Sequence, residues 1–236
     1  GVGMSVHGSH RVVSDRILFA MPETGIGLFP DIGASWFLPC CPGEIGMYLG
    51  LTGHRLRAAD SLYASIGDVH VPADRDEDLI AALVAATTLD GDGVADILRD
   101  FAVDPGEAPL AAHRDAIDRC FAGDSVEDIL ARLAAEDGDW GRAQIETLST
   151  KSPTALKVTF RQLRLGARIE SIAEIMAMEY RLADRSFRGH DLFEGIRAVV
   201  IDKDGAPKWD PTTLDAVSDA DVDEYFVPVA GEPTFG

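Results

Sequence analysis

Hydrophobic residues recur through the middle of this chain at the spacing of one helix face. Apolar side chains stand three or four positions apart within residues 79–84 and again within 126–133, a spacing typical of amphipathic helices. The residues concerned are Leu79, Ile80, Leu83 and Val84, then Val126, Ile129, Leu130 and Leu133. We therefore expect residues 76–133 to be mainly helical, with acidic loops that contain glycine or proline at 90–93 and 104–107.

The first 72 residues follow another pattern, in which short apolar runs alternate with glycine and proline. The expected elements are a helix start over 1–8, strands over 11–14, 17–20 and 68–72, and helices over 32–38, 44–51 and 58–66. Pro39 should end the first of these helices, because proline disfavours helix in the residue before it. Gly53 and Gly67 should end the other two as glycine caps.

The last third of the sequence predicts long helices. Ser152 followed by Pro153 is typical of an N-cap and a first helical position, so a helix should run from there to about Leu165. A second is expected over 169–187, where recurring arginines would pair with Glu179 or Asp184 at helix spacing. The remaining expected elements are a short helix within 189–195, an apolar run over 198–201 before a turn at 202–205, and a tail over 218–224 that is either a capped acidic helix or a loose end.

Composition indicates a globular protein with an acidic surface. Of 236 residues, 46% are hydrophobic and 26% charged, and the formal net charge is -19, so the chain can bury a sizeable core. That charge argues against a nucleic-acid partner, which would favour a basic face. An anionic small molecule stays possible, because a few local cations and helix N-termini can bind phosphate.

Cysteine content and hydropathy limit the cellular compartments in which the protein is expected. There are three cysteines, and the adjacent pair Cys40 and Cys41 has neither metal-ligand nor disulfide spacing, so we expect a reducing cytoplasm. No apolar run approaches the ~20 residues needed to span a bilayer, and no membrane partner is expected.

His7 and His10 could share a helix face, but no third ligand follows them, so no metal site is expected.

Two carboxylates, Glu23 and Asp31, lie in a segment otherwise almost bare of polar side chains, residues 21–33. An uncompensated carboxylate costs several kcal/mol to desolvate, so a pair in apolar surroundings indicates a site. The alternative is that Glu23 lies at the rim of a turn and that Asp31 caps a helix after Pro30. The segment alone leaves both interpretations open.

Several segments together resemble the crotonase superfamily and, within it, the 3-hydroxyisobutyryl-CoA hydrolase branch. They are residues 1–8, 19–33 and 51–56, with 152–157, 178–182, 188–198, 201–204 and 207–209 later in the chain. The resemblance covers nearly the whole sequence and weakens between about 72 and 150. It implies an α/β fold, a ClpP/crotonase-like spiral of β-β-α units. Residues 1–72 would be the C-terminal part of that core, and 73–236 a helix-rich region that completes and covers it.

The sequence departs from the hydratases of that superfamily at two positions. Hydratases carry one glutamate where Gly3 stands and a second where Glu23 stands. Losing the first removes half of the acid and base pair that adds water across a double bond. The position of Asp31 is usually glycine in hydratases, whereas the hydrolases carry aspartate there. The pair of carboxylates is thus placed differently rather than lost.

The resemblance implies hydrolysis of a short 3-hydroxyacyl-CoA thioester, with 3-hydroxyisobutyryl-CoA of valine breakdown as the expected substrate. Glu23 would activate water or attack the thioester itself. Asp31 would bind the 3-hydroxyl, or orient water and protonate the leaving sulfur. Gly1 and Gly3, beside the expected oxyanion hole, complete the candidate substrate-binding residues. CoA is part of the substrate, and no separate cofactor is expected.

Two other functions stay open. One is an enoyl-CoA hydratase or isomerase that uses Glu23 alone, and the other is a non-catalytic chain that binds CoA or associates through this fold. The resemblance also predicts a missing N-terminal half, which would carry a CoA-binding loop and part of the oxyanion hole. Without it, we expect this piece to be inactive and to associate, either with that half or as a homo-oligomer, through exposed apolar surface.

Overall fold

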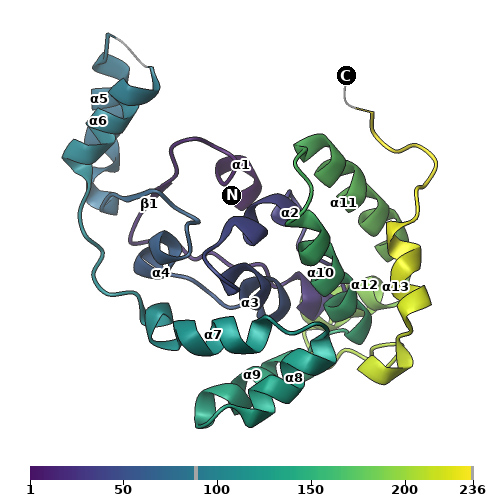
Figure 1. Cartoon of the computed structure of the whole chain (residues 1–236). Helices are drawn as coiled ribbons and strands as arrows, with labels where there is room; N and C mark the ends of the chain where they lie inside the picture. The colour runs from purple at the N-terminus through teal and green to yellow at the C-terminus, as the bar shows by residue number, and fades with distance from the viewer. Residues whose placement is uncertain (88–89, 235–236) are drawn as a thin grey trace. The chain divides into compact units, whose positions relative to one another are not determined.

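The computed structural model describes residues 1–87 and 90–234 and is mainly helical (Figure 1). The chain forms two compact units, each built from two separate segments. The first contains residues 1–20 and 55–114, and the second contains 21–54 and 115–236. Neither matches the predicted domains of residues 1–72 and 73–236, and that division stays a prediction.

The first unit holds a small parallel sheet and short helices. Its elements are α1 (Val2–Ser5), β1 (Val12–Val13), α4 (Ala58–Tyr63), β2 (Val69–His70), α5 (Asp76–Ala85), α6 (Gly91–Phe101) and 3-10 turns at Ala73–Arg75 and Pro109–His113. Strands β1 and β2 pair with Val12 opposite Val69 and Val13 opposite His70. The predicted strands over 11–14 and 68–72 are confirmed as this pair, although each is only two residues long.

Two expectations for this unit are wrong. The strand over 17–20 is reduced to one antiparallel bridge between Phe19 and Leu56, because no neighbouring segment continues the pairing. The helix predicted over 58–66 ends at Tyr63, and Ser65 takes the left-handed conformation, with φ 58°. Gly67 is needed for another reason, since a Cβ there would lie 2.5 Å from the Val13 side chain.

The predicted helix faces are narrower in the structure than in the sequence pattern. In α5, Leu79 is buried and packs with Val71 and Leu98, whereas Ile80 and Val84 are 59% and 79% exposed. In α8 (Val126–Ala135) of the second unit, three of the four predicted positions are buried and Leu130 is half-buried. Spacing therefore identified the helices, but it overestimated how much of α5 is covered.

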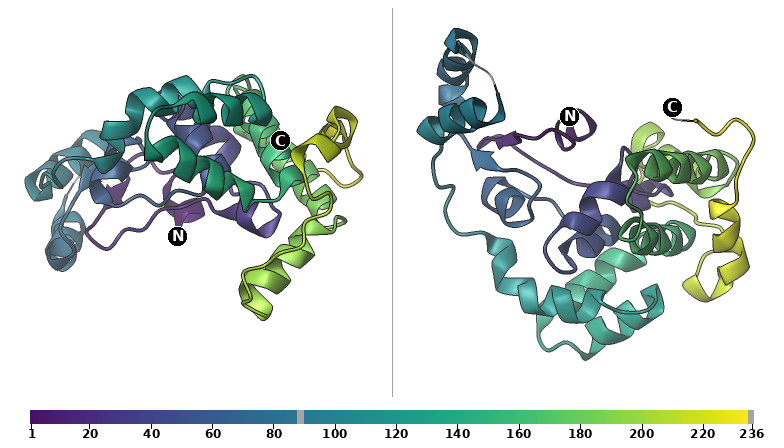
Figure 2. Two further views of the ribbon diagram at one scale, coloured as in Figure 1. Left: turned by 90° about the horizontal axis from the view of Figure 1, so that it is seen from below. Right: turned by 45° about the horizontal axis from the view of Figure 1, so that its top comes forward.

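The second unit contains the remaining helices. In chain order, the first are α2 (Ala34–Phe37), which runs into a 3-10 turn at Leu38–Cys40, α3 (Ile45–Thr52), α7 (Arg114–Phe121) and α8. They are followed by α9 (Asp139–Ser149), α10 (Pro153–Gly166), α11 (Ile172–Ser186), α12 (Asp191–Ile196), a π-helical turn at Arg197–Ile201, and α13 (Asp219–Phe226). Further 3-10 turns lie at Glu23–Ile26 and Leu214–Ala216. Every residue of α3 is buried, so this helix forms the centre of the unit. Helices α10 and α11 both contact α13 (Figure 2).

Local capping signals explain where several of these helices begin and end. The Ser152 hydroxyl accepts a hydrogen bond from the backbone N–H of Ala155 at 3.0 Å, which confirms the predicted start of α10. Gly53 ends α3 with φ 69°, as predicted. Ser218 and Asp221 form a capping box, so the tail is a capped helix rather than a loose end.

A buried cluster holds the carboxylate-bearing loop in place. Phe29, from the segment between Glu23 and Asp31, packs with Val158 of α10, Leu182 of α11 and two further buried valines, Val217 and Val222. Each of these side chains is at most 2% exposed. The loop is thereby fixed two residues before Asp31 by the helices of the last third of the chain.

Candidate active site

The Glu23 segment is a 3-10 turn pressed tightly against α12. The turn covers Glu23–Ile26 and is closed by Gly27 with φ 71°. A Cβ at Gly195 would overlap the backbone of Ile26, and a Cβ at Gly27 would overlap the backbone of Asp191. Only glycine permits this approach at both positions. These contacts set the position of the backbone that carries Glu23.

Glu23 is a partly buried carboxyl group with unusual acidity. Its Oε2 atom is buried and has no hydrogen-bond partner within residues 1–87 and 90–234. Burial, aided by the negative charge of Asp31, raises the pKa of Glu23 from its ordinary 4.5 to about 7. A group with a pKa near the working pH can both take up and release a proton in a reaction. Glu23 therefore has the acidity of a general base at neutral pH.

Asp31 is electrostatically linked to Glu23 and lies in an unusual backbone segment. Burial raises the pKa of Asp31 above its ordinary value. The next two residues, Ile32 and Gly33, have φ 55° and 84°. A positive φ is uncommon for a β-branched residue such as isoleucine and indicates local strain. The structure thus places both predicted carboxylates in one partly buried loop, where the charge of Asp31 adds to burial in raising the pKa of Glu23, and their role as site residues stays a prediction.

Two residues that the sequence did not single out as site residues anchor this loop from behind. Glu179 of α11 accepts hydrogen bonds from Gly33 and Ser35, and Gln162 of α10 donates to the carbonyl of Pro30. The expected pairing of Glu179 with a helix arginine is wrong, because Glu179 is buried against the loop instead. Asp184 pairs with Arg188 at 2.8 Å as expected. No spacing rule predicts contacts between residues more than 130 positions apart.

Gly1 and Gly3 belong to the first compact unit, whereas Glu23 and Asp31 belong to the second. Gly1 precedes α1 as its N-cap, and Gly3 lies within that helix. Both are exposed. Their joint contribution to a substrate site with Glu23 and Asp31 stays a prediction.

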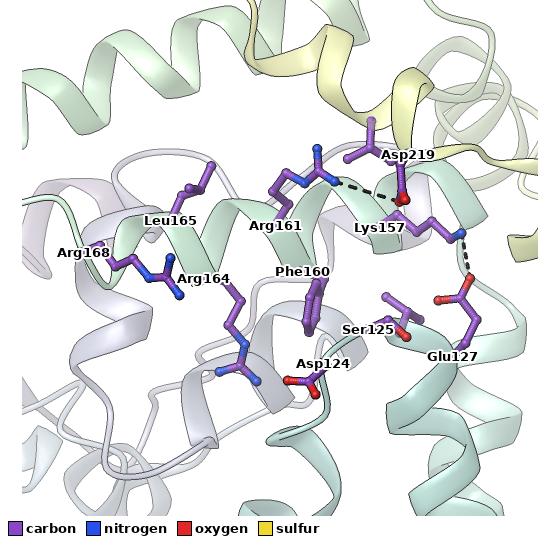
Figure 3. Close-up of a pocket in the computed structure, with 12 residues that line it drawn as sticks. Asp124, Ser125, Glu127, Lys157, Phe160, Arg161, Arg164, Leu165, Arg168 and Asp219 are labelled. Carbon is purple, nitrogen blue, oxygen red and sulfur yellow. Dashed lines mark ion pairs between the residues drawn. The ribbon is translucent and has the colours of Figure 1, made fainter.

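The second unit also has a cavity of about 410 Å³ lined by the cationic face of α10 (Figure 3). Lys157 pairs with Glu127 at 2.6 Å and Arg164 with Glu44 at 2.9 Å, and Arg161 pairs with Asp223. Most of the positive charge is thus neutralised within the protein. Neither Glu23 nor Asp31 lines this cavity, so it does not carry the chemistry predicted for them.

A smaller cavity of about 260 Å³ lies against the loop, where Gly27, Leu28 and Phe29 form part of its wall. Glu23 and Asp31 do not line it either. Within the described ranges, no group of three or more histidine, cysteine or acidic residues could hold a metal ion. No helix in the same ranges is long and apolar enough to cross a membrane.

The raised pKa of Glu23 should make stability depend on pH. Between pH 4.5 and about 7 the folded state holds a proton that the unfolded state has lost, so the free energy of unfolding falls as pH rises. A shift of about 2.5 units corresponds to about 3 kcal/mol. Glutamine does not titrate, so the Glu23→Gln variant does not lose this stability. The free energy of unfolding of Glu23→Gln minus that of wild type should therefore rise by about 2 to 3 kcal/mol from about pH 5 to pH 8, measured by denaturant unfolding. An identical difference at both pH values would contradict the raised pKa.

Comparison with known sequences finds similar proteins across almost the whole chain. A family model described as enoyl-CoA hydratase/isomerase matches residues 1–226. The chain is 45% identical over 231 residues to the mitochondrial 3-hydroxyisobutyryl-CoA hydrolase of Xenopus tropicalis, and 40% identical to that of Homo sapiens. In both comparisons the match covers 96% of this chain and 60% of the relative. The chain therefore spans about three fifths of the length of these relatives.

Two solved structures have closely similar folds. One is described as a carnitinyl-CoA dehydratase from Mycobacterium thermoresistibile, with a TM-score of 0.90 and 40% identity over 99% of this chain and 66% of that one. The other is described as an enoyl-CoA hydratase from Rhodobacter sphaeroides 2.4.1, with a TM-score of 0.85 and 36% identity over 98% and 65% of the two chains.

The relatives correct one prediction. Both sequence relatives above are named as mitochondrial proteins, so the expectation of a cytoplasmic location is wrong. The three cysteines form no disulfide within the described residues, and cysteine content does not distinguish one reducing compartment from another.

Proposed function

This chain belongs to the enoyl-CoA hydratase/isomerase family, and from that premise we propose that it carries the acid and base residues of a 3-hydroxyacyl-CoA thioester hydrolase. The observation that carries the proposal is the Glu23–Asp31 loop, in which the Oε2 atom of Glu23 is buried without a hydrogen-bond partner among the described residues and burial, aided by the charge of Asp31, raises the pKa of Glu23 to about 7. Such a group can activate water at neutral pH. The proposal concerns the whole protein, of which this chain supplies one part.

The resemblance and the fold class predicted from the sequence are confirmed. The family model covers residues 1–226, and both solved structures support the crotonase fold at identities of 36% and 40%. The helix-rich chain with a small parallel sheet fits the C-terminal region of that fold. The relatives compared above are named as a hydrolase, a dehydratase and a hydratase of CoA compounds, so the site must decide which reaction this protein catalyses.

In the proposed reaction, water adds to the thioester carbonyl and the bond from carbon to sulfur breaks. Glu23 takes the proton from water, or attacks the carbonyl carbon itself and forms an anhydride that water then cleaves. The CoA sulfur leaves and gains a proton, which Asp31 would supply if it acts as the acid. If Asp31 instead binds the 3-hydroxyl of the substrate, the thiolate is protonated by solvent. The products are a 3-hydroxy acid and CoA.

The acyl group is proposed from the sequence relatives. Proteins 40% and 45% identical to this chain are named for 3-hydroxyisobutyryl-CoA. Both carboxylates of the loop fit that choice, since a second acidic group near the scissile carbonyl can accept a hydrogen bond from a substrate hydroxyl. We therefore propose 3-hydroxyisobutyryl-CoA as the substrate and valine breakdown as the setting.

A hydratase or dehydratase is the second candidate, and the descriptions of the two solved relatives favour it. The residue at position 3 argues against a hydratase, because this chain has Gly3 where the superfamily's hydratases carry a glutamate. Hydration of an enoyl-CoA also leaves the thioester intact. The two reactions therefore differ in whether free thiol appears.

The test is a thiol assay with the protein expressed from its whole gene. We expect 3-hydroxyisobutyryl-CoA to yield one free thiol per molecule consumed, and the matching enoyl-CoA, methacrylyl-CoA, to be neither hydrated nor cleaved at a comparable rate. Hydration of the enoyl-CoA without thiol release would establish the second candidate. Tight binding of the CoA ester without turnover of either compound would establish a non-catalytic role.

A further inference from the structure

We propose that Glu179 is a positioning residue for Asp31, because its buried carboxylate holds the loop that carries Asp31. The inference deepens the proposed function and rests on it for its kinetic test. Glu179 lies in α11, 148 positions after Asp31, and is only 7% exposed. A carboxylate this deeply buried requires partners, and among the described residues those that hydrogen-bond it come from the loop just after Asp31.

Three donors converge on the Glu179 carboxylate. The backbone N–H of Gly33 donates to Oε2 at 2.8 Å, and the backbone N–H of Ser35 donates to Oε1 at 3.0 Å. The Ser35 hydroxyl donates to the same Oε1 at 2.7 Å. The two backbone groups belong to the start of α2, where N–H groups have no partner within the helix. Glu179 therefore acts as the cap of α2, supplied by a distant helix.

Gln162 of α10 holds the other side of the same loop. Its Nε2 donates to the carbonyl oxygen of Pro30 at 2.7 Å and to the Ser35 hydroxyl at 2.8 Å. Ser35 thus accepts from Gln162 and donates to Glu179, which fixes its hydroxyl. Gly166 lets α10 approach closely, because a Cβ there would overlap the carbonyl of Ser35. The loop is held immediately before Asp31 and again two and four residues after it.

The backbone between these anchors needs such restraint. Ile32 is a β-branched residue with φ 55° and a 42% exposed side chain, and Gly33 follows with φ 84°. Ile32 therefore gains little from burial that could offset its strained conformation. Strained residues persist where the surrounding contacts determine them. The bonds from Glu179 to residues 33 and 35 provide those contacts and so decide where Asp31 points.

Charge also links the two groups. Burial raises the pKa of Glu179 and the negative charge of Asp31 adds to that, whereas the hydrogen bonds from Ser35 and Gly33 lower it. The charge of Asp31 acts on Glu179 of α11 and on Glu23 of the 3-10 turn, while Gln162 from α10 is neutral. Removing the charge of Asp31 should therefore make Glu179 a stronger acid.

The kinetic test compares Glu179→Gln in the wild-type and Asp31→Asn backgrounds, using the protein expressed from its whole gene. In the wild type, kcat for CoA release should fall about 10- to 100-fold, as expected for a displaced catalytic group. In the Asp31→Asn background the same change should have almost no further effect, because its target is already gone. An equal fold-loss in both backgrounds would overturn the proposal. Asp184→Asn, which removes a carboxylate from the same helix, is the matched control and should leave kcat unchanged.

A second readout does not depend on the reaction. The Glu179 carboxyl should titrate at lower pH in Asp31→Asn than in wild type when followed by carbon NMR, because the charge of Asp31 raises its pKa, and an unchanged titration would overturn the proposal. If the wild-type protein releases no CoA, the proposed function fails and this titration alone decides. If Glu179→Gln does not fold, Ser35→Ala removes one of the three bonds and should raise the pKa of Glu179, because the Ser35 hydroxyl lowers it, whereas no shift would overturn the proposal.

Discussion

Replacing Glu23 by glutamine should lower kcat for CoA release from 3-hydroxyisobutyryl-CoA by about 10²- to 10⁴-fold, the range that a positioned general base contributes. Glutamine has nearly the same shape, so the turn of residues 23–26 and its contacts with α12 should be kept. What is lost is the group whose pKa burial and Asp31 raise to about 7. The measurement is steady-state thiol release by the protein expressed from its whole gene.

A matched control separates loss of the base from a general effect of removing a carboxylate. Glu127 forms a half-buried pair with Lys157 at 2.6 Å beside the cationic cavity of α10, and Glu127→Gln should leave kcat within about twofold, because neither residue of the pair belongs to the Glu23–Asp31 loop. If Glu23→Gln hydrolysed the thioester as fast as Glu127→Gln does, Glu23 would be neither the base nor the nucleophile.

Replacing Asp31 by asparagine should reduce kcat/KM for the 3-hydroxyacyl thioester by about 10- to 100-fold, the effect of losing a hydrogen bond to a charged group. The matched substrate isobutyryl-CoA, which lacks the 3-hydroxyl, identifies the role. If Asp31 binds the hydroxyl, the variant loses little activity on isobutyryl-CoA. If Asp31 protonates the sulfur or orients water, both substrates lose activity equally.

Either pattern would place Asp31 in the site, whereas full activity on both substrates would indicate that it is a helix cap.

The Asp31→Asn variant also tests the effect of the Asp31 charge on the pKa of Glu23. Because the charge of Asp31 raises the pKa of Glu23, Asp31→Asn should lower that pKa. The residual activity of the variant should therefore persist to lower pH than that of the wild type.

Local signals in the sequence predicted the helices well where a cap specifies a boundary. Ser152 with Pro153 defined the start of α10, and Gly53 the end of α3. The predictions were wrong where tertiary contacts, rather than local sequence, determine the length of an element. Gly67 is glycine because the Val13 side chain approaches it, not because it caps a helix, and the strand expected around Phe19 found one partner residue instead of a neighbouring strand.

The candidate site could likewise be predicted only as far as local sequence determines it. Glu23 and Asp31 stood out as acids in an apolar segment, and their burial in the structure agrees with that pattern. Glu179 and Gln162 did not stand out, because they lie in amphipathic helices where a polar residue is ordinary. Only the fold brings them to residues 30–35.

The pH dependence of kcat/KM for CoA release tests the central claim most directly, since it reports the protonation of the free enzyme's essential groups. If Glu23 must be ionised to activate water or to attack, kcat/KM should rise with pH and level off with an apparent pKa of about 7. That limb should move to lower pH in Asp31→Asn. A rate independent of pH between about 5 and 8, or a limb that Asp31→Asn leaves in place, would contradict the role of Glu23 in a coupled pair of carboxylates.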